Sequence, residues 1–99
     1  MTIKLVNRGT EAEVLLGGRL ESAAVPEAEA IFKDIEERFD RVILNMATLE
    51  YISSAGLRLI LMLDKTMHRK SGEMIIKNVN KMVMEVFEMV GFVGHLRIL

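Results

Sequence analysis

The sequence predicts a single α/β domain with a mainly parallel sheet, and three observations support this fold class. Short apolar segments rich in Val and Ile alternate with longer segments whose apolar residues recur at helical spacing. Turn residues separate the segments, and strand–helix alternation places parallel strands side by side through right-handed crossovers. The composition, 51% hydrophobic and 27% charged over 99 residues, is that of one folded domain, which we expect to fill residues 1–99.

The expected order of elements is β-β-α-β-α-β-α-β, with about five strands, an N-terminal β-hairpin and three main helices. Residues 2–7 alternate polar and apolar side chains, and residues 13–17 contain a short apolar run. Because only a short turn around Gly9 separates these two strands, they should form an antiparallel hairpin. The paired glycines Gly17 and Gly18 are predicted to end the second strand, so that residues 17–21 leave the sheet.

The later elements are predicted from their periodicity and their end residues. Pro26 suits the first helical position, and residues 27–38 carry apolar side chains on one helical face. An apolar burst at 41–45 is typical of a buried central strand. The remaining elements are a long helix over 54–70, a short strand over 74–77, a helix that Asn80 caps and Gly91 ends, and a last strand over 95–99.

Charge and cysteine content exclude several classes of function. Thirteen basic and fourteen acidic residues give a net charge of −1 with no basic stripe, so we expect no nucleic-acid partner. The absence of cysteine removes disulfides and thiolate metal sites and fits the cytoplasm, the localisation that we expect. The first residues form no signal peptide. The longest apolar run, 59–63, is far shorter than the roughly 20 residues that cross a bilayer, so we expect no membrane insertion.

No pattern of catalytic or metal-binding residues is present in the sequence. His68 and His95 belong to no His-x-x-x-His or His-Glu pair. Gly17-Gly18 lacks the third glycine of a dinucleotide-binding loop, and the Gly-Lys-Ser/Thr of a P-loop does not occur. We therefore predict a binding protein without a catalytic residue, a metal site or a cofactor, rather than an enzyme.

The segment that links the predicted central strand to the long helix stands out. Ser53 and Ser54 fall at the carboxyl edge of a parallel sheet, where open α/β folds bind their ligands. A helix start there offers unpaired N–H groups and about half a positive charge, which suits a phosphate. Ala55 and Gly56 add little bulk around the hydroxyls. Because serine is also a preferred N-cap, the residues alone leave open two interpretations, a helix cap and a phosphate-accepting docking site.

Four segments, spread in order along nearly the whole chain, follow the pattern of one family. They are Gly18-Arg19-Leu20-Glu21; Ile52-Ser53-Ser54-Ala55-Gly56-Leu57-Arg58, preceded by Val42-Ile43-Leu44-Asn45; Ser71-Gly72-Glu73-Met74; and Val86-Phe87-x-x-Val90-Gly91-Phe92. Each segment alone is a weak signal, whereas the set is specific. The chain resembles the bacterial anti-sigma factor antagonists, the stand-alone STAS domains.

The resemblance implies partner switching. Members of this family bind an anti-sigma factor, a serine kinase of the GHKL type, and so release a sigma factor. The kinase ends the binding by phosphorylating a residue in Asp-Ser-x-Gly, and a PP2C-type phosphatase restores it. On this sequence the acceptor is Ser54, Ser53 stands at the Asp position as the fallback acceptor, and Glu21 replaces the Asp of the earlier loop. The residues expected to contact the partner are Arg19, Glu21, Ser53, Ala55, Gly56, Leu57, Arg58 and Leu61.

Two alternatives use the same fold. The first is an accessory STAS subunit that binds a nucleotide or small ligand through Gly17-Gly18 and Ser53-Ser54, or that regulates a transporter, lipid transporters included. The absence of a glycine-rich loop with an adjacent lysine argues against tight nucleotide binding. The second is a regulator in another partner-switching circuit, such as a stressosome or polysaccharide export, which depends on the same serine and surface.

Overall fold

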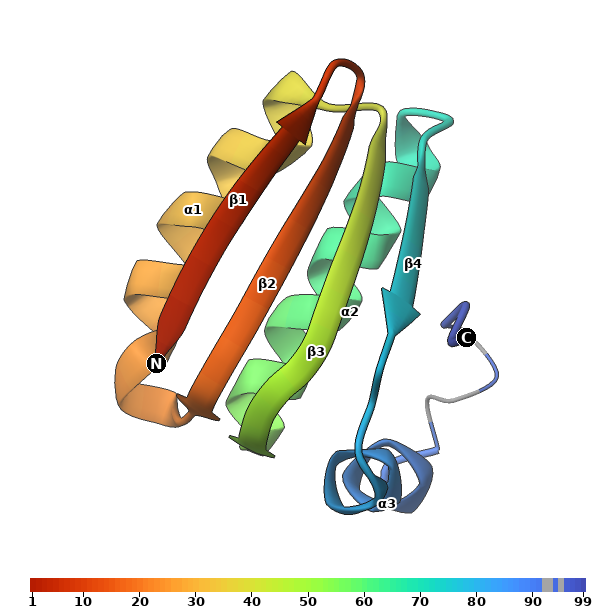
Figure 1. The fold of residues 1–99 in the computed structure, drawn as a ribbon. Coiled ribbons are helices and arrows are strands. Elements are labelled where there is room, and N and C mark those ends of the chain that lie inside the picture. Colours follow the sequence, from red (N-terminus) through yellow and green to blue (C-terminus); the bar gives the residue numbers. More distant parts are fainter. Residues whose placement is uncertain (92–93, 95) are drawn as a thin grey trace.

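The computed structural model describes residues 1–91, 94 and 96–99, and it forms a four-stranded mixed sheet with helices (Figure 1). The elements are β1 (Thr2–Arg8), β2 (Glu11–Leu20), the 3-10 turn η1 (Ser22–Ala24), α1 (Val25–Arg38), β3 (Arg41–Ile52), α2 (Ser54–Arg69), β4 (Glu73–Lys77) and α3 (Lys81–Met89). The strand order is β1-β2-β3-β4; β1 pairs antiparallel with β2, and the other two pairings are parallel. The predicted class, the hairpin and the three main helices are confirmed.

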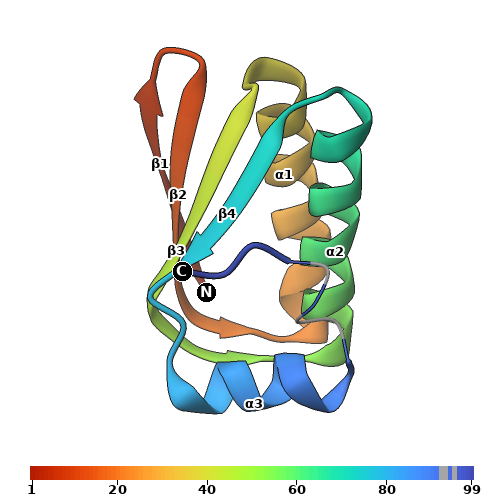
Figure 2. The same cartoon turned by 90° about the vertical axis from the view of Figure 1, so that its right-hand side faces the viewer.

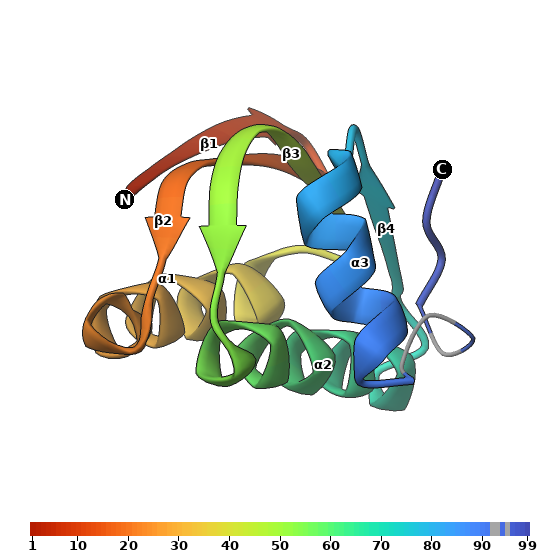
Figure 3. The same ribbon diagram turned by 90° about the horizontal axis from the view of Figure 1, so that it is seen from below.

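The helices divide between one face of the sheet and one of its ends. Helices α1 and α2 cover one face, and α3 lies across the end at which β2 and β3 finish (Figures 2 and 3). The core lies between the sheet and α1 and α2, because alternate strand residues point toward the helices. Among its fully buried side chains are Val14, Leu16, Val42, Leu44, Met46, Ile76, Phe32, Ile35, Ile60, Leu63 and Met67.

The second strand does not end at Gly17 as predicted. It continues to Leu20, and β3 continues well beyond the predicted Asn45. The extended pairs are Gly17 with Thr48, Gly18 with Leu49, Arg19 with Tyr51 and Leu20 with Ile52. A Cβ atom added at Gly17 would lie 2.6 Å from Thr2 Oγ1, and Gly18 has φ +78° beside a register shift. The glycines therefore mark close packing and a bulge within the sheet, and they do not end the strand.

The predicted fifth strand over 95–99 is reduced to one bridge, in which Ile98 pairs parallel with Ile76. The Ile76 N–H donates to the Arg97 carbonyl at 2.9 Å, and the Leu99 N–H donates to the Ile76 carbonyl at 2.8 Å. Leu96 is buried in the core, and the residues around it pair with β4 only through Ile98. His95, the first residue of the predicted strand, lies outside the described residues.

Asn80 fixes the position of α3. Its Oδ1 accepts a hydrogen bond from the Val83 N–H at 2.8 Å, which confirms the predicted cap. Its Nδ2 donates to the Leu49 carbonyl of β3 at 2.7 Å. Because Val83 and Phe87 are also buried in the core, α3 is held against the end of the sheet by both its cap and its apolar face.

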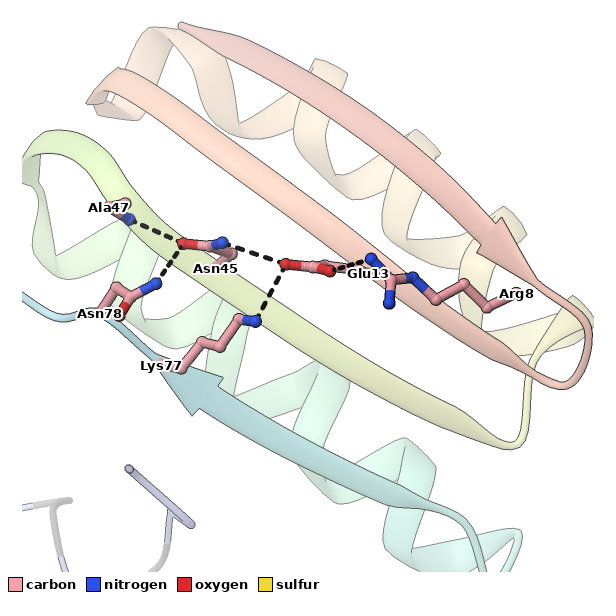
Figure 4. A network of polar contacts seen from close by, with 6 residues as sticks. All are labelled: Arg8, Glu13, Asn45, Ala47, Lys77 and Asn78. Atoms are coloured by element: carbon pink, nitrogen blue, oxygen red, sulfur yellow. Dashed lines mark hydrogen bonds and ion pairs between the residues drawn. The ribbon is translucent and has the colours of Figure 1, made fainter.

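A polar network occupies the helix-free face of the sheet (Figure 4). The Glu13 carboxylate accepts hydrogen bonds from Arg8 at 2.8 Å and from Asn45 at 3.0 Å, and Lys77 Nζ lies 3.2 Å from it. Asn45 Oδ1 accepts in turn from the Ala47 N–H and from Asn78. The bond from Asn45, and then that from Lys77, holds the pKa of the Glu13 carboxyl below its ordinary value of 4.5, although burial opposes this.

Candidate functional site

Ser53 is the N-cap of α2, and both its side chain and its backbone are engaged. Its Oγ accepts a hydrogen bond from the Gly56 N–H at 3.1 Å, and its own N–H donates to the Leu20 carbonyl at 2.9 Å. The first bond satisfies one of the N–H groups that a helix start leaves unpaired, and the second joins the start of α2 to the end of β2. For Ser53, the structure bears out the cap interpretation.

Ser54 is the first residue of α2, and its side chain is exposed. The helix dipole and the unpaired N–H groups of the first turn make this position favourable for negative charge. Two adjacent serines therefore have different environments. The hydroxyl of Ser53 completes the helix cap, whereas the hydroxyl of Ser54 faces the surroundings of the protein.

Gly56 and Leu57 hold α2 against the sheet. A Cβ atom added at Gly56 would lie 2.7 Å from Leu20 Cγ and 2.9 Å from the Leu20 carbonyl oxygen, so only glycine allows this approach. Leu57 is 1% exposed and belongs to the hydrophobic core. Their burial shows that both position the exposed residues beside them, and the contact with a partner that the sequence suggests for them stays a prediction.

Arg19 and Glu21 form the neighbouring rim at the end of β2. Arg19 Nε donates to Glu21 Oε1 at 2.7 Å, which raises the pKa of the Arg19 guanidinium. The same guanidinium lies 4.4 Å from the centre of the Tyr51 ring, a cation–π contact that the pairing of Arg19 with Tyr51 in the sheet makes possible. Both charged side chains are exposed, so this part of the predicted site is a preformed surface pair.

A hollow of about 220 Å³ lies beside Ser54, between α2 and the end of α3. Its lining consists of Ser54, Leu57, Arg58, Leu61 and Val90. Val90 directly follows α3 and is 39% exposed. It is absent from the site predicted by sequence, although the family pattern includes it, because only the tertiary structure brings α3 to α2.

Arg58 is the cation of this hollow, and its charge is not neutralised by a neighbour. Within the part of the chain that the structure describes, every arginine except Arg58 and Arg69 takes part in an ion pair. Arg58 is exposed and stands four residues after Ser54, so the two side chains lie on the same face of α2, one turn apart.

Other kinds of site find little support in the structure. Residues 1–91, 94 and 96–99 hold no group of three or more His, Cys, Asp or Glu that could bind a metal ion. Gly17 and Gly18, which a nucleotide-binding alternative needs as a phosphate loop, lie within β2. None of the helices among the described residues has the length and apolar character to span a membrane.

The chain is a small α/β domain with an exposed serine at the start of α2. A model of the STAS domain family matches residues 16–98. Over 80 residues the chain is 37% identical to "Putative anti-sigma factor antagonist BtrV" of Bordetella bronchiseptica, which covers 80% of this chain and 69% of that protein. The chain belongs to the STAS domain family, in the group that includes anti-sigma factor antagonists, and the resemblance inferred from the motifs is confirmed.

Solved structures share this fold. The anti-sigma factor antagonist SpoIIAA in its unphosphorylated form matches with a TM-score of 0.79 at 20% identity, over 99% of this chain and 87% of that chain. SpoIIAA of Bacillus in its phosphorylated form matches with a TM-score of 0.78 at 20% identity, over 99% and 91%. An anti-sigma factor antagonist candidate from Thermotoga maritima matches with a TM-score of 0.85 at 16% identity, over 98% and 83%.

Proposed function

We propose that this chain is an anti-sigma factor antagonist that is switched by phosphorylation of Ser54. It binds an anti-sigma factor of the GHKL serine kinase type and thereby releases a sigma factor; the kinase then phosphorylates Ser54, and a PP2C-type phosphatase reverses the modification. The observation that carries the proposal is the exposed Ser54 hydroxyl at the first position of α2. The 37% identity between this chain and BtrV supports an anti-sigma factor as the partner.

The environments of the two serines favour Ser54 over Ser53 as the acceptor. Ser53 is only half-exposed, and its Oγ already accepts the hydrogen bond from the Gly56 N–H, so a phosphate on Ser53 would require the cap of α2 to rearrange. A phosphate on Ser54 leaves that bond in place. It also adds about −1.5 to −2 charges where the helix dipole is favourable.

The same charge opposes a closely packed partner. Burying a phosphate in an interface without a compensating cation costs several kcal/mol. Since about 1.4 kcal/mol changes an affinity tenfold, this cost is enough to dissociate a micromolar complex. SpoIIAA has been solved both with and without its phosphate, and the chain matches the two forms about equally well, which fits a modification that acts on binding and leaves the fold intact.

The test is a pull-down with a GHKL-type kinase encoded in the same genome. Ser54→Ala should bind and resist dissociation by ATP, and Ser54→Glu should bind weakly while keeping its melting temperature. Intact-mass measurement after incubation with the kinase and ATP should show one added phosphate on the wild type and on Ser53→Ala, and none on Ser54→Ala. If the kinase binds the wild type, Ser54→Ala and Ser54→Glu equally well, the proposed switch is wrong.

A further inference from the structure

The hollow between α2 and α3 combines an apolar floor with one unneutralised cation. Leu57, Leu61 and Val90 supply the apolar part, and Ser54 and Arg58 supply the polar part. The hollow thus spans two helices, of which only α2 belonged to the expected site. An apolar pocket beside an arginine is typical of the centre of a protein–protein interface. Arginine is enriched there, and buried apolar side chains supply most of the affinity.

The wall that α3 supplies is held firmly in place. The Asn80 cap attaches the start of α3 to β3, and Val83 and Phe87 are buried beneath it. Val90 follows at the far end of the helix and reaches the first turns of α2. A pocket whose walls are fixed before binding loses little conformational entropy when it is filled.

The size of the hollow favours a side chain of a protein over a small ligand. Its volume of about 220 Å³ lies below the roughly 300–1,000 Å³ typical of small-molecule sites. A single apolar side chain needs no more than this space. The arginine adds a second requirement, because an exposed guanidinium that lacks an ion pair is suited to a carboxylate, which it can bind through two parallel hydrogen bonds.

We propose that this hollow receives an apolar side chain of the anti-sigma partner, and that a carboxylate next to that side chain pairs with Arg58. The inference rests on the proposed function and extends the docking surface onto α3 through Val90. Ser54 stands on the rim of the same hollow, one turn from Arg58. A phosphate there narrows the entrance and offers Arg58 a competing anion, so one modification opposes both the apolar and the ionic contact.

Three charge variants of comparable exposure test the hollow against the same GHKL-type kinase, which is chosen because it binds the unmodified chain. Val90→Glu and Arg58→Glu should each lower the affinity by roughly tenfold or more, the scale of a residue at the centre of an interface. Met82→Glu is the matched control: Met82 is 59% exposed and lies on α3, but it stands near the start of that helix and does not line the hollow. The affinity of this control variant for the kinase should stay within about twofold of the wild-type value, because a residue outside the contact contributes little to binding.

The outcomes separate this inference from the proposed function. If Ser54→Glu abolishes binding while Val90→Glu binds like wild type, the switch stands and the role of the hollow is wrong. If Met82→Glu loses as much affinity as Val90→Glu, the partner does not distinguish the hollow from the rest of α3, and the inference also fails. Val90→Ser serves as a second variant if thermal melting shows that Val90→Glu has unfolded, and it should also weaken binding. The ionic contact is tested by reversal: an acid-to-arginine change in the kinase should restore binding to Arg58→Glu and to no other variant.

Discussion

Two polar regions of this domain differ in whether their polar side chains have partners within the chain. On the helix-free face of the sheet, Glu13 is 7% exposed and contacts Arg8, Asn45 and Lys77. At the start of α2, Ser54 and Arg58 are exposed, and Arg58 has no ion pair within the described chain. The first region uses its polar groups to hold all four strands together, whereas the second leaves them available to another molecule.

The position of each region in the fold explains the difference. The Glu13 network lies in the middle of the sheet, where the neighbouring strands supply partners from both sides. The start of α2 lies at the end of the sheet, where the chain leaves β3 and where the rim of β2 and the end of α3 are its neighbours on the side of the hollow. Each prediction below separates residues that stabilise the fold from residues that are free to bind.

The largest expected effect concerns two adjacent residues of α2. Leu57→Ala should lower the free energy of unfolding by about 2–5 kcal/mol, because it leaves a cavity in the core. Arg58→Ala, at an exposed position, should change it by less than about 0.5 kcal/mol. Urea unfolding followed by circular dichroism measures both values. Equal stability losses would contradict the division between a buried support and an exposed contact.

The Glu13 network gives a pH-dependent contribution to stability. The pKa of Glu13 is lowered in the folded protein, so its ionised form stabilises the fold above the ordinary value of 4.5, and this contribution is lost as the pH falls through the lower folded pKa. At pH 7, Glu13→Gln should lower the free energy of unfolding by about 1–3 kcal/mol, since Arg8 and Lys77 lose their anion. The difference between the two proteins should shrink below pH 4.5. A constant difference from pH 7 to pH 3 in urea midpoints would show that ionisation of Glu13 does not matter.

Local signals predicted the parts of the fold that depend on local chemistry. A helix cap depends on a hydrogen bond to a residue three positions further along the chain. The residue types at Asn80 and at Ser53–Ser54 therefore suffice to predict these two helix starts. The extension of β2 to Leu20 depends on pairing with Thr48 and Ile52, which are distant in the sequence. Local signals around Gly17 do not include these partners, and they wrongly predict that the strand ends there. The prediction of a fifth strand is wrong for a related reason: how far this segment pairs depends on its contacts with Ile76 and with the core, which are distant in the sequence.

The candidate site shows the same limit. Helical spacing alone predicts that Ser54 and Arg58 lie on one face of the helix, one turn apart. Leu57, on an apolar helix, fits a core role and a docking role equally well until its burial is known. Val90 could not be assigned to the site, because it stands 36 positions after Ser54 in the sequence and only the packing of α3 closes that distance.

Replacing each of the two serines by alanine should have opposite effects: one substitution should lower stability, and the other should prevent phosphorylation. Ser53→Ala should lower the free energy of unfolding by about 0.5–2 kcal/mol, the usual cost of losing an N-cap, and should still be phosphorylated on Ser54. Ser54→Ala should keep its stability within about 0.5 kcal/mol and lose the phosphate. Urea unfolding and intact mass measure the two properties on the same samples. A phosphate found on Ser53 would reverse the assignment.

The smallest expected effect tests whether Arg58 senses a phosphate on Ser54. Free phosphoserine has a second pKa of about 6, and a cation one helical turn away should lower it. With phosphoserine installed at position 54, a ³¹P NMR titration should give a pKa about 0.3 units higher in Arg58→Gln than in the wild type, as expected for an exposed i,i+4 charge pair. Arg69→Gln is the matched control, because Arg69 is the other arginine of α2 without an ion pair in the described chain and lies about 22 Å along the helix from Ser54. If both variants shift the titration equally, the effect is one of net charge; if only Arg58→Gln does, the phosphate interacts with the arginine that we assign to the partner.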